Sequence, residues 1–297
     1  MSTLSPSPHT PLIAGLSGIA HRYDGFILDL FGVVHNGVEL YPGTLDCLEA
    51  MRSRGKKTVL LSNTPKRASS STKDLEGIGI PQDLYTCLIT AGDATYNAIS
   101  EPQDDFHESL GNHCWFLGSD IVKHLTTGLN LTFVDGPHEA DFILSAMPDK
   151  TGLNDRELEN AFKQSIKKDI PMICANPDLV VHIGEDMHYC AGHYARLYED
   201  LGGFVAYHGK PYGAVYKMAL KAMDMHDKSK VLAIGDSLHT DIQGANNYGI
   251  SSILNLIGIH REELLSGPDD DIDMEQVSLV LKNSAYRPQM VMAGLKW

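Results

Sequence analysis

Residues 25–34 read GFILDLFGVV, a short apolar run with a single polar exception in its middle, Asp29. Such runs are typical of strands that are buried on both faces of a parallel sheet. A helix pattern follows at 43–55, where Leu45, Leu48 and Met51 recur three residues apart, and 57–63 (KTVLLSN) reads as a second buried strand. The chain therefore begins by alternating strand and helix.

This alternation continues along much of the sequence. The predicted elements are a helix from near Pro65, a strand and a helix within 83–100, a helix at 210–223, a strand at 230–237, a helix at 241–249 and a strand at 251–258. Strands that alternate with helices form doubly wound sheets. We therefore expect an α/β protein whose core is a doubly wound, Rossmann-like parallel sheet.

A second alternating region interrupts this core. It has its own strand patterns at 113–118, 131–135, 141–146 and 171–175, and helix patterns at 154–168 and 188–203. We expect an N-terminal tail at 1–19, a core formed by 20–102 and 206–297, and an inserted α/β domain at 103–205 that caps the core. The last residues are placed only as a tail that packs on the core.

Composition excludes several classes of protein. A chain of 297 residues suits two domains. The net charge of −14 and the lack of a Lys/Arg-rich tract argue against nucleic acid as a partner. Five scattered cysteines indicate reduced thiols. Without a signal-peptide pattern or about 18 consecutive apolar residues, the sequence predicts a cytoplasmic protein with no membrane span.

Polar residues stand at the ends of three predicted core strands: Asp29, the pair Ser62-Asn63, and Asp236. Ligands of open parallel sheets bind outside the carboxyl ends of strands, so these side chains should converge. A single aspartate at a strand end is often only a turn former. Three such ends together favour a functional site.

The stretch GDSLHTDIQGA (235–245) places Asp236 directly after a strand and Asp241 five residues later, beside the start of a helix. Two carboxylates that face one cavity repel each other unless a cation lies between them. Magnesium prefers oxygen ligands and keeps several waters, so one or two carboxylates suffice to hold it. The alternative is that Asp241 only caps its helix.

Four segments resemble, in order and spacing, the motifs of the haloacid dehalogenase superfamily: DLFGVVHNG (29–37), LLSNTPKR (60–67), GKPYGAVY (209–216) and GDSLHTDIQGA (235–245). The insertion between the second and third motifs resembles the subgroup with a large α/β cap, which includes NagD-type and pyridoxal phosphate phosphatases. CANPD (174–178) and YCAGHY (189–194) match the style of that cap. The ending RPQMVMAGLKW (287–297) is similar to that of an uncharacterised bacterial branch.

The resemblance implies a hydrolase that releases phosphate from a small phosphorylated metabolite and uses Mg²⁺. Asp29 would attack phosphorus and form an aspartyl-phosphate, and would also ligate the cation. Ser62, the backbone amide of Asn63 and Lys210 would hold the phosphoryl group. Asp236 would be a direct metal ligand, and Asp241 would orient a metal-bound water or Lys210. Taken alone, Lys210 would be read as a surface lysine.

One position departs from the family pattern. Phosphatases of this superfamily usually carry a second aspartate two residues after the nucleophile, as general acid and base, and here that residue is Phe31. Its backbone carbonyl would still bind the cation. Three hypotheses follow: a phosphatase limited to good leaving groups or given its proton by another residue such as His35, a phosphate-binding or regulatory protein that turns over poorly, or a dehalogenase. Asp236 and Asp241 argue against the dehalogenase, which needs no magnesium.

Substrate choice should lie in the cap, which excludes water and contacts the leaving group. By resemblance, the loop that begins at Asn176 faces the site, and Asp178, His182 and Tyr189 are candidate contacts. The alternative for each is turn chemistry or surface exposure. Members of this subgroup often form dimers through the cap, so the resemblance implies a homodimer.

Overall fold

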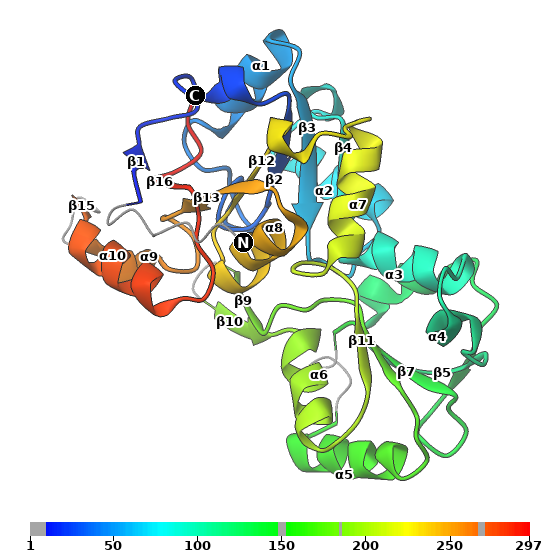
Figure 1. The fold of residues 1–297 in the computed structure, drawn as a ribbon. Coiled ribbons are helices and arrows are strands. Elements are labelled where there is room, and N and C mark those ends of the chain that lie inside the picture. Colours follow the sequence, from blue (N-terminus) through cyan, green and yellow to red (C-terminus); the bar gives the residue numbers. More distant parts are fainter. Residues whose placement is uncertain (1–9, 148–152, 184–185, 267–270) are drawn as a thin grey trace, which may run out of the picture. The chain divides into compact units, whose positions relative to one another are not determined.

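The structure, a computed structural model, describes residues 10–147, 153–183, 186–266 and 271–297 (Figure 1). The chain forms two compact units. The first contains Met1–Leu61, Ile78–Cys87 and Ala219–Trp297, and the second contains Ser62–Gly77 and Leu88–Met218. Within the described residues, no helix is both long and apolar enough to cross a bilayer. All five cysteines are free, as predicted.

A seven-stranded sheet in the order β1-β16-β13-β12-β2-β3-β4 forms the core of the first unit. Its strands are β1 (Leu12–Ile13), β2 (Gly25–Leu28), β3 (Lys57–Ser62), β12 (Val231–Gly235), β13 (Ser251–Asn255), β16 (Met290–Met292) and β4 (Cys87–Thr90), at which the chain enters the second unit. The pairings from β1 through β3 are all parallel. The predicted parallel α/β core is confirmed.

The strand order reverses beside β2. From β2 the chain proceeds to β3 and then β4, whereas after its return it places β12, β13 and β16 on the opposite side. β2 and β12 are direct neighbours, with Ile27 in register with Ala233. Such a reversal opens a crevice at the carboxyl ends of the two strands, where α/β sheets bind their ligands. Asp29 and Asp236 are the residues that follow these strands.

Helices cover this sheet. Three of them lie where the sequence predicts helices, with small shifts: α1 (Thr44–Ser53), α8 (Gln243–Tyr248) and α7 (Gly213–Ala222), along which the chain returns to the first unit. The other two, α9 (Arg261–Leu264) and α10 (Met274–Asn283), lie in a region for which the sequence predicted no helix. In α1 the buried side chains include Cys47, Leu48 and Met51, whereas Leu45 is exposed. The buried face thus follows the 3.6-residue period of a helix more closely than the three-residue spacing seen in the sequence.

The second unit is built on its own parallel sheet, in the order β11-β8-β7-β5-β6. Its strands are β5 (His113–Leu117), β6 (Thr132–Val134), β7 (Phe142–Ser145), β8 (Met172–Cys174) and β11 (Val205–Tyr207), and β9 (Val180–Ile183) and β10 (Asp186–Tyr189) form a separate antiparallel hairpin. Its helices are α2 (Ala68–Gly77), α3 (Ala91–Ser100), α4 (Asp105–Glu108), α5 (Asp155–Ile166) and α6 (Ala191–Asp200). The predicted inserted α/β sheet is confirmed.

Aromatic packing and helix caps stabilise this second sheet. The Phe162 ring packs edge-on against Trp115 and Tyr198, at centroid distances of 6.4 and 5.1 Å. Asn154 and Glu157 form a capping box at the start of α5, which satisfies two backbone amides that a helix would otherwise leave unpaired. The sheet is therefore supported by a core of its own.

Three local predictions differ from the structure. Residues 188 and 189, predicted in a helix, belong to strand β10, and α6 begins only after Cys190, whose backbone is extended. The helix expected from near Pro65 begins at Ala68. The end of the chain is more than a packed tail, because β16 is a strand of the core sheet and pairs with β1.

Candidate functional site

Three aspartates converge at the switch point of the first unit. Asp29, Asp236 and Asp241 each direct a carboxylate oxygen to within 4.8 Å of the others. All three residues are buried, with exposed fractions of 8%, 7% and 5% respectively. The sequence predicted that they would meet, and the fold brings them together.

Backbone contacts fix each of these carboxylates. The amide of Asp29 donates to the carbonyl of Ile234 (2.9 Å), and its own Oδ1 accepts from the Leu30 amide (2.7 Å). Asp236 Oδ2 accepts from the Ile259 amide at 2.7 Å. Asp241 Oδ2 accepts from the Ser237 amide at 3.2 Å. These bonds leave the carboxylates few orientations.

Asp241 also contacts the start of its helical turn, although it is not the N-cap that the alternative hypothesis proposed. The turn Leu238–Ile242 is a π-helical turn whose N-cap is Ser237, with the Ser237 hydroxyl accepting from the Thr240 amide at 3.3 Å. Asp241 reaches back to the Ser237 amide while belonging to the carboxylate cluster. Ser237 caps the turn, and Asp241 supports this end of the turn while it belongs to the cluster.

Two glycines allow the backbone to approach Asp236. A Cβ atom on Gly32 would lie 1.9 Å from Asp236 Oδ2, and one on Gly258 would lie 2.1 Å from the same oxygen. Gly32 also has a φ of +77°, which side chains disfavour. Neither position accepts a larger residue unless the carboxylate moves.

The donor set fits magnesium. Three carboxylates that lie close together in a poorly solvated place repel one another strongly, so they need protons or a cation. The donors are all oxygens, which suits Mg²⁺ better than a transition metal that prefers nitrogen or sulfur. Within the described residues, this is the one cluster of three or more His, Cys, Asp or Glu side chains with this geometry.

Sequence reasoning missed two residues near the carboxylate cluster, Tyr41 and Asn255. Burial, and next the charge of Asp236, raise the pKa of Tyr41, while Arg261 opposes them. Asn255 is fully buried and bonds the Gly32 carbonyl. An asparagine inside the apolar run 251–258 was the available signal for the second.

In the second unit, the side chain of Asn63 holds the segment that carries Lys210. Asn63 Oδ1 accepts from the Lys210 amide (2.7 Å), and Asn63 Nδ2 donates to the Lys210 carbonyl (3.1 Å). Asn63 and Lys210 are both buried, each with 3% exposed. The second and third motifs are thus joined through this asparagine side chain, a role that the sequence did not reveal.

The cap loop meets the same asparagine. Asn63 Nδ2 also donates to Asp178 Oδ1 at 2.8 Å, and the Asp178 amide donates to Asn176 Oδ1 at 3.0 Å. The Asn176 side chain therefore closes a turn, and the Asp178 carboxylate, one of the candidate contacts, accepts a hydrogen bond from the protein. Tyr189 is 46% exposed and stacks on His193, whereas the side chain of His182 lies outside the described residues.

The candidate proton donor, His35, is packed against Phe31. Their ring centroids are 4.6 Å apart with an edge-on geometry, and His35 Nδ1 accepts from the Gly37 amide at 3.0 Å. Burial lowers the pKa of His35 to about 4. The ring is consequently neutral at pH 7, which makes it a poor source of a proton for a leaving alcohol.

This burial predicts a pH effect on stability. An unfolded histidine takes up a proton below its ordinary pKa of 6.5, whereas folded His35 resists protonation until about pH 4. The contribution of neutral, buried His35 to the free energy of unfolding is therefore complete above pH 6.5. It is lost as pH falls toward 4, at up to about 1.4 kcal/mol per pH unit. His35→Asn keeps the acceptor for the Gly37 amide but does not titrate. The free energy of unfolding, measured in urea between pH 7 and pH 4.5, should therefore depend less on pH in this variant.

The matched control is His226→Asn, since the His226 side chain is 96% exposed. Its pH profile should follow that of the parent. A parallel shift of the His35→Asn curve, with no change in slope, would contradict the prediction.

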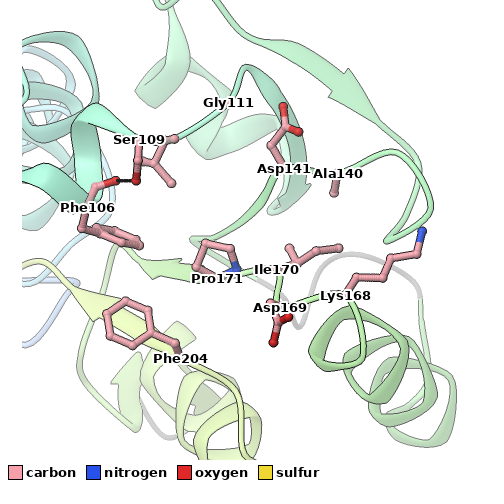
Figure 2. Close-up of a pocket in the computed structure, with 11 residues that line it drawn as sticks. Phe106, Ser109, Gly111, Ala140, Asp141, Lys168, Asp169, Ile170, Pro171 and Phe204 are labelled. Atoms are coloured by element: carbon pink, nitrogen blue, oxygen red, sulfur yellow. Dashed lines mark hydrogen bonds between the residues drawn. The ribbon is translucent and has the colours of Figure 1, made fainter.

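A pocket of about 720 Å³ lies in the second unit (Figure 2). Several of its lining residues stand just before strands of the cap sheet, among them Asp141 before β7, Pro171 before β8 and Phe204 before β11. Asn176 and Lys210 instead follow the carboxyl ends of β8 and β11. The pocket therefore lies at the opposite edge of the cap sheet from the predicted site residues.

Comparison with known proteins identifies the family. Residues 26–132 match the family model described as haloacid dehalogenase-like hydrolase, and residues 207–283 match a second one described as HAD-hydrolase-like. The chain belongs to the haloacid dehalogenase superfamily. Its cap and its relatives place it in the NagD-like subgroup, as the motif order predicted.

Solved structures and curated relatives agree on this placement. A haloacid dehalogenase-like hydrolase from Brucella suis 1330 has a TM-score of 0.80 and 27% identity, over 95% of this chain and 99% of that one. NagD from Escherichia coli K-12 has a TM-score of 0.67 and 21% identity, over 92% and 96%. The sugar-phosphatase AraL of Bacillus subtilis is 27% identical over 84% of this chain and 89% of its own.

Proposed function

We propose that this member of the haloacid dehalogenase superfamily is a magnesium-dependent phosphatase of a small phosphorylated metabolite. The observation that carries the proposal is the buried cluster of Asp29, Asp236 and Asp241 at the sheet's switch point. The cluster offers oxygen ligands to a cation and, in Asp29, a nucleophile to a phosphate ester.

The reaction would proceed in two steps. An oxygen of Asp29 attacks phosphorus, the bond from phosphorus to the ester oxygen breaks, and the alcohol leaves with its electron pair and then takes a proton. A water next attacks phosphorus and gives up a proton to the solvent, the bond from phosphorus to the Asp29 oxygen breaks, and inorganic phosphate and the Asp29 carboxylate are released. Covalent catalysis of this kind divides one difficult hydrolysis into two easier ones.

The other motif residues would bind and orient the phosphoryl group. By the family resemblance, the Ser62 hydroxyl and the Asn63 backbone amide donate to its oxygens, and the Lys210 ammonium neutralises its charge. The Asn63 side chain supports this role because it fixes the Lys210 backbone through two hydrogen bonds. Bound Mg²⁺, held by Asp29, Asp236 and the Phe31 carbonyl with support from Asp241, would supply positive charge that offsets the phosphate.

The substrate class follows from the relatives. AraL is named a sugar-phosphatase and NagD a ribonucleotide monophosphatase, so sugar phosphates and nucleotides are the first candidates here. Asn176 and Asp178 would shape the cap loop more than they would contact the substrate, because both are engaged in bonds within the protein. The homodimer and the cytoplasmic location stay predictions from the sequence.

Phe31 favours one alternative function. Without the usual acid, the same site would bind phosphate and Mg²⁺ but release alcohols slowly, as a phosphate-binding or regulatory protein would. A dehalogenase is disfavoured because a halide leaving group gains nothing from three cation-binding carboxylates.

Metal removal separates these functions. We expect the protein to hydrolyse p-nitrophenyl phosphate with Mg²⁺ and to lose essentially all activity in excess chelator, because the carboxylates then repel both one another and the phosphate. Nitrophenolate leaves without a proton, so Phe31 does not limit this substrate. Initial rates with chelator, and after Mg²⁺ is restored, provide the test. A protein that binds Mg²⁺ but releases no nitrophenolate would favour the binding function instead.

A further inference from the structure

Asn255 joins the loop after the nucleophile to the end of the chain. It is the last residue of β13, and its side chain is fully buried. Its Nδ2 donates to the Gly32 carbonyl at 2.6 Å, and its Oδ1 accepts from the Gly294 amide at 2.8 Å. A buried amide that satisfies two backbone groups in distant segments fixes their separation.

Gly32 is a sensitive point in this arrangement. It lies three residues after Asp29, its φ is +77°, and its Cα packs directly against the Asp236 carboxylate. Its amide donates to the His35 carbonyl at 3.1 Å. Glycine loses more conformational freedom on folding than any other residue, so a contact that holds its carbonyl determines how well this loop keeps its shape.

The C-terminal segment that Asn255 bonds through Gly294 is itself held by backbone hydrogen bonds. The Leu256 amide donates to the Met292 carbonyl, and the Leu16 amide donates to the Lys296 carbonyl, both at 2.9 Å. Leu295 between them is fully buried. The C-terminal residues, whose role the sequence left open, thus form a rigid support for Asn255.

We propose that Asn255 is a positioning residue that holds the Asp29–Gly32 loop in the geometry that binds the cation; this rests on the magnesium site of the proposed function. The Gly32 carbonyl is one peptide away from the Phe31 carbonyl, the predicted backbone ligand, so its orientation fixes that peptide too. Partners behind metal ligands typically change metal affinity 10- to 100-fold when they are removed.

The chain offers a matched control in Asn246 of α8. Its Nδ2 donates to the Arg287 carbonyl (3.1 Å) and its Oδ1 accepts from the Arg287 amide (2.9 Å). Like Asn255, the Asn246 side chain bonds one backbone carbonyl and one backbone amide, and it also joins distant segments of the first unit. Its hydrogen bonds do not involve the loop of Asp29, so its removal reports the loss of stability when such a pair of bonds is broken away from the site.

The test is calorimetric titration of Mg²⁺ into the full-length parent, Asn255→Leu and Asn246→Leu, with thermal melting of each. We expect both variants to melt at lower temperature. Only Asn255→Leu should bind Mg²⁺ about 10- to 100-fold more weakly. Folded Asn255→Leu with the affinity of the parent would overturn the inference, as would an equal loss of affinity in Asn246→Leu.

A second variant, Asn255→Asp, keeps the inference testable if Asn255→Leu does not fold. It keeps an acceptor for the Gly294 amide and places an oxygen opposite the Gly32 carbonyl, so at pH 8 it should also bind Mg²⁺ more weakly than the parent. Because binding is measured without turnover, the two proposals fail differently. A parent that binds no Mg²⁺ defeats the proposed function, whereas a parent and an Asn255→Asp protein that bind equally well defeat only the role of Asn255.

Discussion

Asp29→Asn should abolish phosphate ester hydrolysis while leaving the protein folded. An amide oxygen is a far weaker nucleophile than a carboxylate, and removal of a covalent nucleophile costs about 10⁴-fold or more in kcat. The substitution is isosteric, and the amide oxygen can still accept from the Leu30 amide as Asp29 Oδ1 does now. Initial rates with p-nitrophenyl phosphate and Mg²⁺ measure the loss.

Two controls separate lost chemistry from lost structure. Asp227→Asn removes an exposed carboxylate of the first unit and should leave the rate unchanged. Without Mg²⁺, Asp29→Asn should melt no lower than the parent, because it removes one of three carboxylates that repel one another across 4.8 Å or less. If Asp29→Asn retained a substantial fraction of the parent rate, the aspartyl-phosphate mechanism would be wrong.

The carboxylate cluster was predictable because it depends on local patterns. Apolar runs located β2 and β12, and the polar residue after each run located Asp29 and Asp236. Parallel strands bring their carboxyl ends to one edge, so the convergence followed from the fold class alone. Asp241 followed because it lies only five residues after Asp236, where the sequence predicted a helix to begin; in the structure it lies within the turn Leu238–Ile242.

Contacts between distant segments could not be predicted in this way. Asn255 bonds Gly32 across 223 positions in the chain, and Asn63 bonds Lys210 across 147. The two-residue strand β1 is too short to show a period in the sequence, and its partner is β16, far away in the chain. Side-chain bonds of this kind depend on packing, which periodicity does not encode.

Phe31→Asp should raise the hydrolysis of alkyl phosphates about 10²- to 10⁴-fold, the usual contribution of a positioned general acid. An alkoxide leaves poorly without a proton, whereas nitrophenolate does not need one, so the rate with p-nitrophenyl phosphate should change little. The nearby Asp29 carboxylate would raise the pKa of the new side chain, which helps it to hold its proton at pH 7. Initial rates of phosphate release from the two substrate types measure the effect.

Phe31→Asn is the matched control, because it has the shape of aspartate and removes the same aromatic contact with His35 but carries no acidic proton. If Phe31→Asp gains activity on alkyl phosphates and Phe31→Asn does not, the gain comes from the acid and the parent is limited by its absence. If both variants gain equally, the phenyl ring obstructs the site. If neither gains while both still hydrolyse p-nitrophenyl phosphate, the leaving alcohol takes its proton from another group, and Phe31 does not limit the reaction.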